Sequence, residues 1–154
     1  MTRLSTLAIL VVVLLLATLP EGQCFDPCVA YSTLNNPFRS TGYMARDGVD
    51  PMICDSKLKP GWYRFVNEVG GKMPQTKVDK YQCGTYAPIW MKTPHPTAAN
   101  GTVDGTACIN YNNMKNGCLS LAIKVKYCNI NGTFYVYHLV PPFGCPMAYC
   151  AGMF

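Results

Sequence analysis

The chain has 154 residues, with 13 Lys and Arg against 8 Asp and Glu and a net charge of +5. This length excludes an enzyme built from two large lobes, because one domain ordinarily takes about 100–150 residues. The positive charge is too modest and too scattered for a nucleic-acid-binding protein.

The first segment has the three parts of a secretory signal peptide. A positively charged start leads into an apolar run over residues 4–19, which is shorter than the about 20 residues of a membrane-spanning helix. Small residues precede a cleavage site, as Gly22 and Cys24 do here. We therefore predict a signal peptide over 1–24 and one mature domain over 25–154, secreted without a membrane anchor. Cleavage after Gly22, which would retain Cys24, and a retained signal anchor are the alternatives.

Short runs of β-branched and aromatic residues, bounded by Gly and Pro, follow along the mature chain. Residues 61–66 form one such run and predict a strand. A short helix is the expectation around residues 105–114. Apolar residues alternate with charged ones over residues 119–128, and bulky residues occupy both faces of 133–140. The Asn-Gly pair within 129–132 predicts a β-hairpin between these arms, since both residues accept positive φ.

The cysteines indicate a disulfide framework, and their number supports the predicted cleavage. Removal of Cys24 leaves an even number that can form four disulfides outside the cell. Eight cysteines allow 105 pairings, and the sequence does not choose among them. The predicted disulfide cysteines are Cys28, Cys54, Cys83, Cys108, Cys118, Cys128, Cys145 and Cys150.

Neither a metal site nor a catalytic site is predicted. The sequence has no Cys-x-x-Cys, no His-Glu-x-x-His and no Gly-x-Ser-x-Gly motif. His95 lies between two prolines, where a role in fixing a turn is expected, and His138 lies in a predicted strand, far from His95. We therefore expect a non-enzymatic protein without a cofactor.

Two motifs predict N-linked glycans. Asn100 and Asn131 each begin an Asn-Gly-Thr sequon in a turn-rich stretch, where a bulky polar glycan can project into water. Together with the cysteines and the hairpin, these features predict a small, disulfide-stapled single domain, mainly β with short helices and a C-terminal β-hairpin.

An ordered set of motifs over essentially the whole mature chain resembles the eight-cysteine domain of the uromodulin and pancreatic zymogen-granule glycoprotein family. The motifs are Asp26-Pro27-Cys28, Cys54-Asp55, Gly61-Trp62-Tyr63-Arg64-Phe65, Met73-Pro74, Cys83-Gly84-Thr85, His95-Pro96, Tyr135-Val136-Tyr137, Pro141-Pro142 and Tyr149-Cys150. The resemblance implies an extracellular, non-enzymatic domain. In uromodulin-type proteins this domain is associated with presenting a mannose-rich glycan to bacterial adhesins, from a sequon between the tryptophan and His-Pro. That stretch has no asparagine here, and Asn100 is the nearest sequon.

The function expected from the sequence is therefore binding in the extracellular space, by presenting glycans or a protein surface to a partner that the sequence does not identify. A structural component of an extracellular, skeletal or shell matrix is the first alternative, because a basic domain adheres to acidic material. A venom or gland secretory protein is the second.

Overall fold

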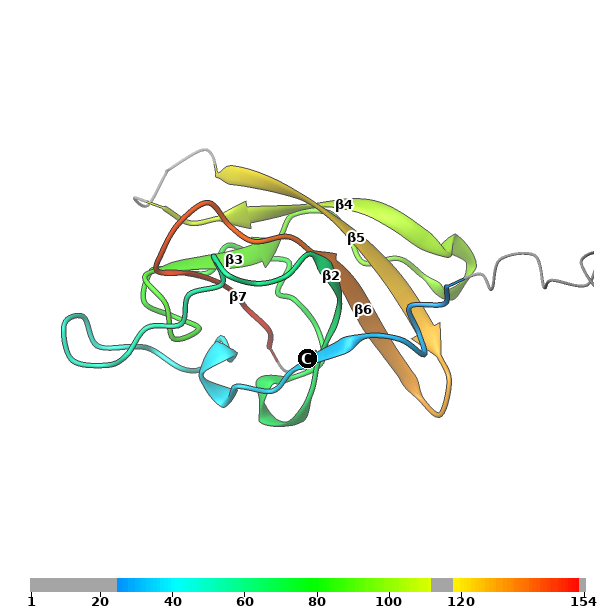
Figure 1. The fold of residues 1–154 in the computed structure, drawn as a ribbon, viewed down its shortest axis with the longest axis horizontal. Coiled ribbons are helices and arrows are strands. Elements are labelled where there is room, and N and C mark those ends of the chain that lie inside the picture. Colours follow the sequence, from blue (N-terminus) through cyan, green and yellow to red (C-terminus); the bar gives the residue numbers. More distant parts are fainter. Residues whose placement is uncertain (1–24, 112–117, 153–154) are drawn as a thin grey trace, which may run out of the picture.

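Seven strands form one curved sheet within residues 25–111 and 118–152, the parts of the chain that the computed structural model describes (Figure 1). The predicted signal peptide and Cys24 lie outside these parts. The sheet order is β1-β2-β6-β5-β4-β3-β7, with β1–β2 and β3–β7 parallel and the other pairs antiparallel. The strands are β1 (Ser32–Leu34), β2 (Gly61–Phe65), β3 (Ala87–Met91), β4 (Thr102–Ile109), β5 (Leu119–Asn129), β6 (Thr133–Leu139) and β7 (Met147–Tyr149).

The predicted hairpin is present as β5 and β6, and the strand predicted over residues 61–66 is β2. Strands β5 and β6 pair from Asn129 opposite Thr133 to Lys124 opposite His138. Asn131 and Gly132 take positive φ values of 54° and 113° in the connecting turn, as the Asn-Gly signal predicts.

Both faces of β6 pack against other residues. Tyr137 and Leu139 lie in the main apolar core, whereas Val136 on the opposite face packs with Cys28 and Cys128. This arrangement explains why bulky residues occupy both faces of β6, while β5 keeps a charged outer face.

The helix expected around residues 105–114 is wrong for the described part of that range. Residues 102–109 form β4, which pairs with β5 from Thr102 opposite Lys126 to Ile109 opposite Leu119. Ala107 and Ile109 face the core on alternate positions, but Gly105 and Ala107 are small and obscure this period of two. Residues 112–114 lie outside the described parts.

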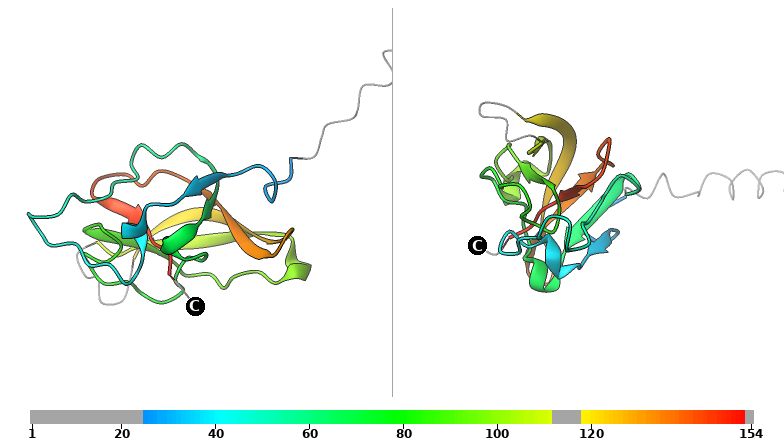
Figure 2. Two further views of the ribbon diagram at one scale, coloured as in Figure 1. Left: turned by 90° about the horizontal axis from the view of Figure 1, so that it is seen from below. Right: turned by 90° about the vertical axis from the view of Figure 1, so that its left-hand side faces the viewer.

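The sheet is curled, as the end-on view on the right of Figure 2 shows. Leu34 in β1 and Tyr149 in β7, at opposite edges of the sheet, belong to the same apolar cluster. Isolated bridges join Ser40 to Ala151 and Lys72 to Gly152. Loops from the β1–β2 side therefore reach the chain after β7 and close the curl.

The fold class predicted from the sequence is confirmed: the domain is small, mainly β, stapled by disulfides and contains the C-terminal hairpin. Its short helices are three-residue 3-10 turns: η1 (Pro37–Arg39), η2 (Asn67–Val69) and η3 (Ala98–Asn100).

Candidate functional site

Four disulfides connect segments that are distant along the chain. The pairs are Cys28–Cys128, Cys54–Cys145, Cys83–Cys150 and Cys108–Cys118, with sequence separations of 100, 91, 67 and 10. Because the entropy removed from the unfolded chain grows with loop length, the first three restrict it most. The bonds lie in different parts of the domain, so they stabilise the fold and do not form one reactive centre.

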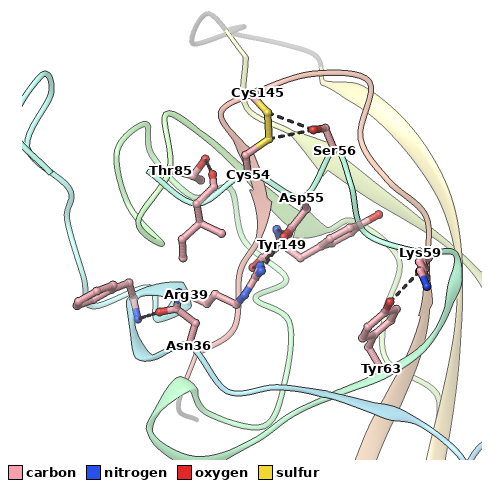
Figure 3. A network of polar contacts seen from close by, with 12 residues as sticks. Asn36, Arg39, Cys54, Asp55, Ser56, Lys59, Tyr63, Thr85, Cys145 and Tyr149 are labelled. Carbon is pink, nitrogen blue, oxygen red and sulfur yellow. Dashed lines mark hydrogen bonds and ion pairs between the residues drawn. A yellow bond between two sulfur atoms is a disulfide. The ribbon is translucent and has the colours of Figure 1, made fainter. Parts of the chain in front are cut away.

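A buried ion pair lies beside the second of these bonds (Figure 3). The Asp55 carboxylate accepts from both terminal nitrogens of Arg39 at 2.6 and 2.7 Å, and Asp55 Oδ2 also accepts from the Tyr149 backbone N–H at 2.9 Å. Arg39 Nη1 in turn donates to the Tyr149 carbonyl at 3.2 Å. This network joins η1, the segment next to Cys54 and β7, so we assign it to structure.

The two predicted glycosylation sites lie at the same end of the sheet. Asn100 ends η3 just before β4, and Asn131 lies in the turn before β6; both are exposed. The first residue of β4 pairs near the end of β5, at Lys126, and the first residue of β6 pairs with Asn129. The start of β4 and the β5–β6 turn accordingly both lie at the right-hand end of Figure 1.

The local geometry leaves each sequon accessible. Asn100 Oδ1 accepts from the Thr97 backbone N–H at 2.8 Å and from the Thr97 hydroxyl at 2.5 Å, whereas an N-linked glycan is attached at Nδ2. Asn131 lies in the hairpin turn with positive φ and is exposed. Both asparagines are therefore open to solvent.

A groove opens between β2 and β6, where the two strands separate. They pair from Gly61 opposite Leu139 to Tyr63 opposite Tyr137, and beyond that point a cavity of about 280 Å³ lies between them. We call it the aromatic–basic groove. It is lined by Arg64, Phe65, Gly71, Lys72, Tyr127, Thr133, Phe134 and Tyr135.

Cations and aromatic rings alternate along this groove. The Arg64 guanidinium carbon lies 3.8 Å from the centre of the Phe134 ring, and Arg64 Nη1 donates to the Tyr31 hydroxyl at 3.0 Å. Lys72 Nζ lies 5.4 Å from the centre of the Tyr135 ring. Cation–π contacts of this kind hold the charged groups in place beside apolar surface.

Comparison with known families matches residues 63–151 to the uromodulin-like eight-cysteine domain. The chain belongs to this family. The matched range begins inside β2 and ends just after β7, so it includes both sequons and every residue that lines the groove.

Full-length relatives give the same result. This uromodulin-like domain is 44% identical over 131 residues to the pancreatic secretory granule membrane major glycoprotein GP2 of Rattus norvegicus, covering 84% of this chain and 23% of that protein. It is 42% identical over 134 residues to uromodulin of Rattus norvegicus (85% and 19%) and 38% identical over 133 residues to GP2 of Homo sapiens (85% and 23%). The chain therefore spans about a quarter or less of the length of these relatives.

His95 packs within the uromodulin-like domain against the tyrosines of β6. Its ring centre is 4.7 Å from that of Tyr135, and its Nε2 lies 2.9 Å from the Tyr137 hydroxyl, which also accepts from the Met73 N–H at 3.1 Å. Burial, and then the charge of Lys72, lower the pKa of His95 from 6.5 to about 4. The neutral ring is thus part of the packing. His138 contacts Trp62 edge to face on the other side of β6.

The sequence predictions missed the groove, although its parts were visible. Arg64 lies in the predicted strand and the aromatic residues lie in the predicted hairpin, but the sequence did not show that β2 and β6 are neighbours. Thr133, the third residue of the Asn131 sequon, lines the groove. One predicted glycosylation site therefore lies next to the groove. Asn100 does not line it.

Metal-ligating clusters and membrane-spanning helices are both absent from residues 25–111 and 118–152. No group of three or more His, Cys, Asp or Glu side chains suited to a metal ion is present in these ranges. The same ranges contain no helix with the length and apolar character needed to span a membrane.

Proposed function

We propose that this chain is a secreted, N-glycosylated binding domain that acts without catalytic turnover, by presenting glycans at Asn100 and Asn131 to an extracellular partner. The observation that carries the proposal is that both sequon asparagines are exposed and lie at one end of the sheet. Two glycans there would be offered to a partner from the same side, away from the closed core.

The four disulfides support an extracellular location, because such bonds form and persist in oxidising compartments. The name of the GP2 relatives describes a glycoprotein of the secretory granule membrane, which supports glycosylation and passage through the secretory route. The absence of a catalytic motif in the sequence supports a binding role. In the competing form of this proposal, the partner contacts the protein surface itself and not the glycans.

The first test is the intact mass of the protein secreted from a eukaryotic host, before and after enzymatic deglycosylation and with thiol alkylation. We expect a chain that starts at Phe25, carries no free thiol and loses the mass of two glycans on deglycosylation. A chain with no glycan would overturn the proposal directly.

The second test removes each glycan without changing the asparagine. Thr102→Ala and Thr133→Ala abolish the sequons, whereas Thr102→Ser and Thr133→Ser retain them and serve as matched controls. Because Asn131 has φ of 54° in the turn, this design avoids a substitution at a strained position. A mannose-specific adhesin should bind the Ser variants as it binds the original protein and should lose binding to the double Ala variant. Equal binding to all of them would exclude glycan presentation.

A further inference from the structure

The aromatic–basic groove has the form of a binding site, because its walls come from strands that no longer pair. Beyond Tyr63 opposite Tyr137, strand β2 stays paired with β1, with Arg64 opposite Thr33, and no longer pairs with β6, which stays paired with β5. Phe65, which is 1% exposed, lies at the base of the opening. The volume of about 280 Å³ is close to the roughly 300 Å³ lower limit of ordinary small-ligand pockets.

Arg64 is held ready to bind an anion. Stacking on Phe134 and the bond from Nη1 to Tyr31 fix the guanidinium plane. Among the residues that the structure describes, no carboxylate forms an ion pair with Arg64. A fixed guanidinium with donors remaining on Nε and Nη2 matches the two oxygens of a carboxylate.

The remaining walls offer both apolar faces and hydroxyl groups. Tyr127 and Tyr135 meet edge to face with ring centres 5.5 Å apart, and Thr133, which carries a hydroxyl, belongs to the same lining. A sugar ring presents C–H groups on its faces and hydroxyls at its edge, so it suits aromatic surface with polar groups beside it.

We propose that the aromatic–basic groove binds a carboxylate-bearing sugar, such as the terminal sialic or uronic acid of a glycan. Arg64 binds the carboxylate, with Lys72 adding positive charge, and the tyrosine and phenylalanine rings pack against the sugar ring. This goes beyond glycan presentation, since here the domain receives a sugar, and it holds whether or not the sequons are occupied.

The size and position of the groove favour a sugar over an acidic peptide. A peptide added as a strand needs a continuous length of unpaired strand, whereas the opening here accommodates about one ring. A glycan source also lies next to it, because Thr133 is both a lining residue and the third position of the Asn131 sequon. The acidic sugar can therefore come from the chain's own glycan or from another glycoprotein.

The test is an NMR titration of the secreted, disulfide-intact protein after sialidase treatment, with 3′-sialyllactose against neutral lactose as probes. We expect 3′-sialyllactose to shift resonances of Arg64, Phe134 and Tyr135 and to bind at least about tenfold more tightly than lactose, as loss of a charged hydrogen bond implies. Arg64→Gln should remove that preference, and Arg64→Lys should retain part of it. Lys57→Ala, at an exposed lysine outside the groove, should change nothing.

Two further comparisons identify the source of the bound sugar and test an acidic peptide as the competing ligand. Stronger 3′-sialyllactose binding after sialidase treatment than before it would mean that the chain's own glycan occupies the groove; equal binding would assign the groove to another glycoprotein. Equal affinity for lactose and sialyllactose, absence of shifts at the groove, or groove shifts with a tetraglutamate peptide but not with the sugar would each overturn the proposal. The Thr-to-Ser and Thr-to-Ala comparison tests glycan presentation separately, so the two ideas can fail independently.

Discussion

Replacing Asp55 by alanine should destabilise the domain far more than removing an exposed carboxylate. Asp55 is 3% exposed, and its two oxygens accept from Arg39 at 2.6 and 2.7 Å and from the Tyr149 N–H at 2.9 Å. The substitution leaves a guanidinium buried without its counter-charge and a backbone donor without its acceptor, and neither group reaches water easily.

Breaking a buried ion pair by removing one partner costs about 3–5 kcal/mol. For a domain of this size, that loss lowers the melting temperature by roughly 10–20 °C. A matched control is Asp104→Ala, since Asp104 is 86% exposed where it pairs with Lys124 at 2.7 Å. Exposed pairs contribute about 0–1 kcal/mol, so the control should unfold close to the unsubstituted protein.

The assay is urea unfolding of the secreted protein with its disulfides intact, followed by tyrosine and tryptophan fluorescence. The double variant Arg39→Met with Asp55→Leu removes both charges and should regain much of the lost stability, because apolar pairs of similar volume replace buried ion pairs well. If Asp55→Ala and Asp104→Ala unfold within about 1 kcal/mol of each other, the reasoning is refuted. Should Asp55→Ala fail to be secreted while the double variant is secreted, the same conclusion about the unpaired charge follows.

Two other predictions concern pH and backbone conformation. Folding favours neutral His95, because burial and then the charge of Lys72 lower its pKa from 6.5 to about 4. The contribution of this group to the free energy of unfolding is about 1–2 kcal/mol after allowing for partial exposure. That contribution is complete above pH 6.5 and is lost as the pH falls toward 4. Unfolding measured across that range should show this slope, and the same slope in His95→Phe would assign it to other groups. Gly84 (φ +63°) and Gly48 (φ +68°) are both left-handed, but an added Cβ would lie 3.0 Å from Phe38 only at Gly84. Gly84→Ala should therefore cost about 2–4 kcal/mol and Gly48→Ala about 1, a ranking that thermal unfolding checks and that equal losses would contradict.

The parts of the fold that the sequence predicted correctly are those fixed by local pattern. In β5, Ile123 and Val125 are buried while Lys124 is exposed, and this alternation is visible without any partner strand. The Asn131-Gly132 turn is equally local, because positive φ selects these residue types. Residues near each other in sequence were therefore enough to predict the hairpin.

The failures arose where the deciding contacts are distant. Gly105 in β4 packs its backbone against Ile123, where an added Cβ would lie 3.4 Å from that side chain. The pairing with Ile123 is what keeps Gly105 in a strand, but along the chain this glycine resembles a break in any pattern. The cysteine pairing was undetermined for the same reason, since three of the four bonds join residues 67 to 100 positions apart.

The point at which β2 and β6 stop pairing connects the candidate sites. Strand β6 runs from Thr133 to Leu139, but it pairs with β2 only as far as Tyr137. The rest of β6 stays paired with β5 and leads back to the Asn131 turn, whereas β2 continues to Phe65 paired with β1. The same separation opens the aromatic–basic groove between the two strands, so the exposed sequon and the groove share Thr133 as a direct consequence of the sheet's geometry.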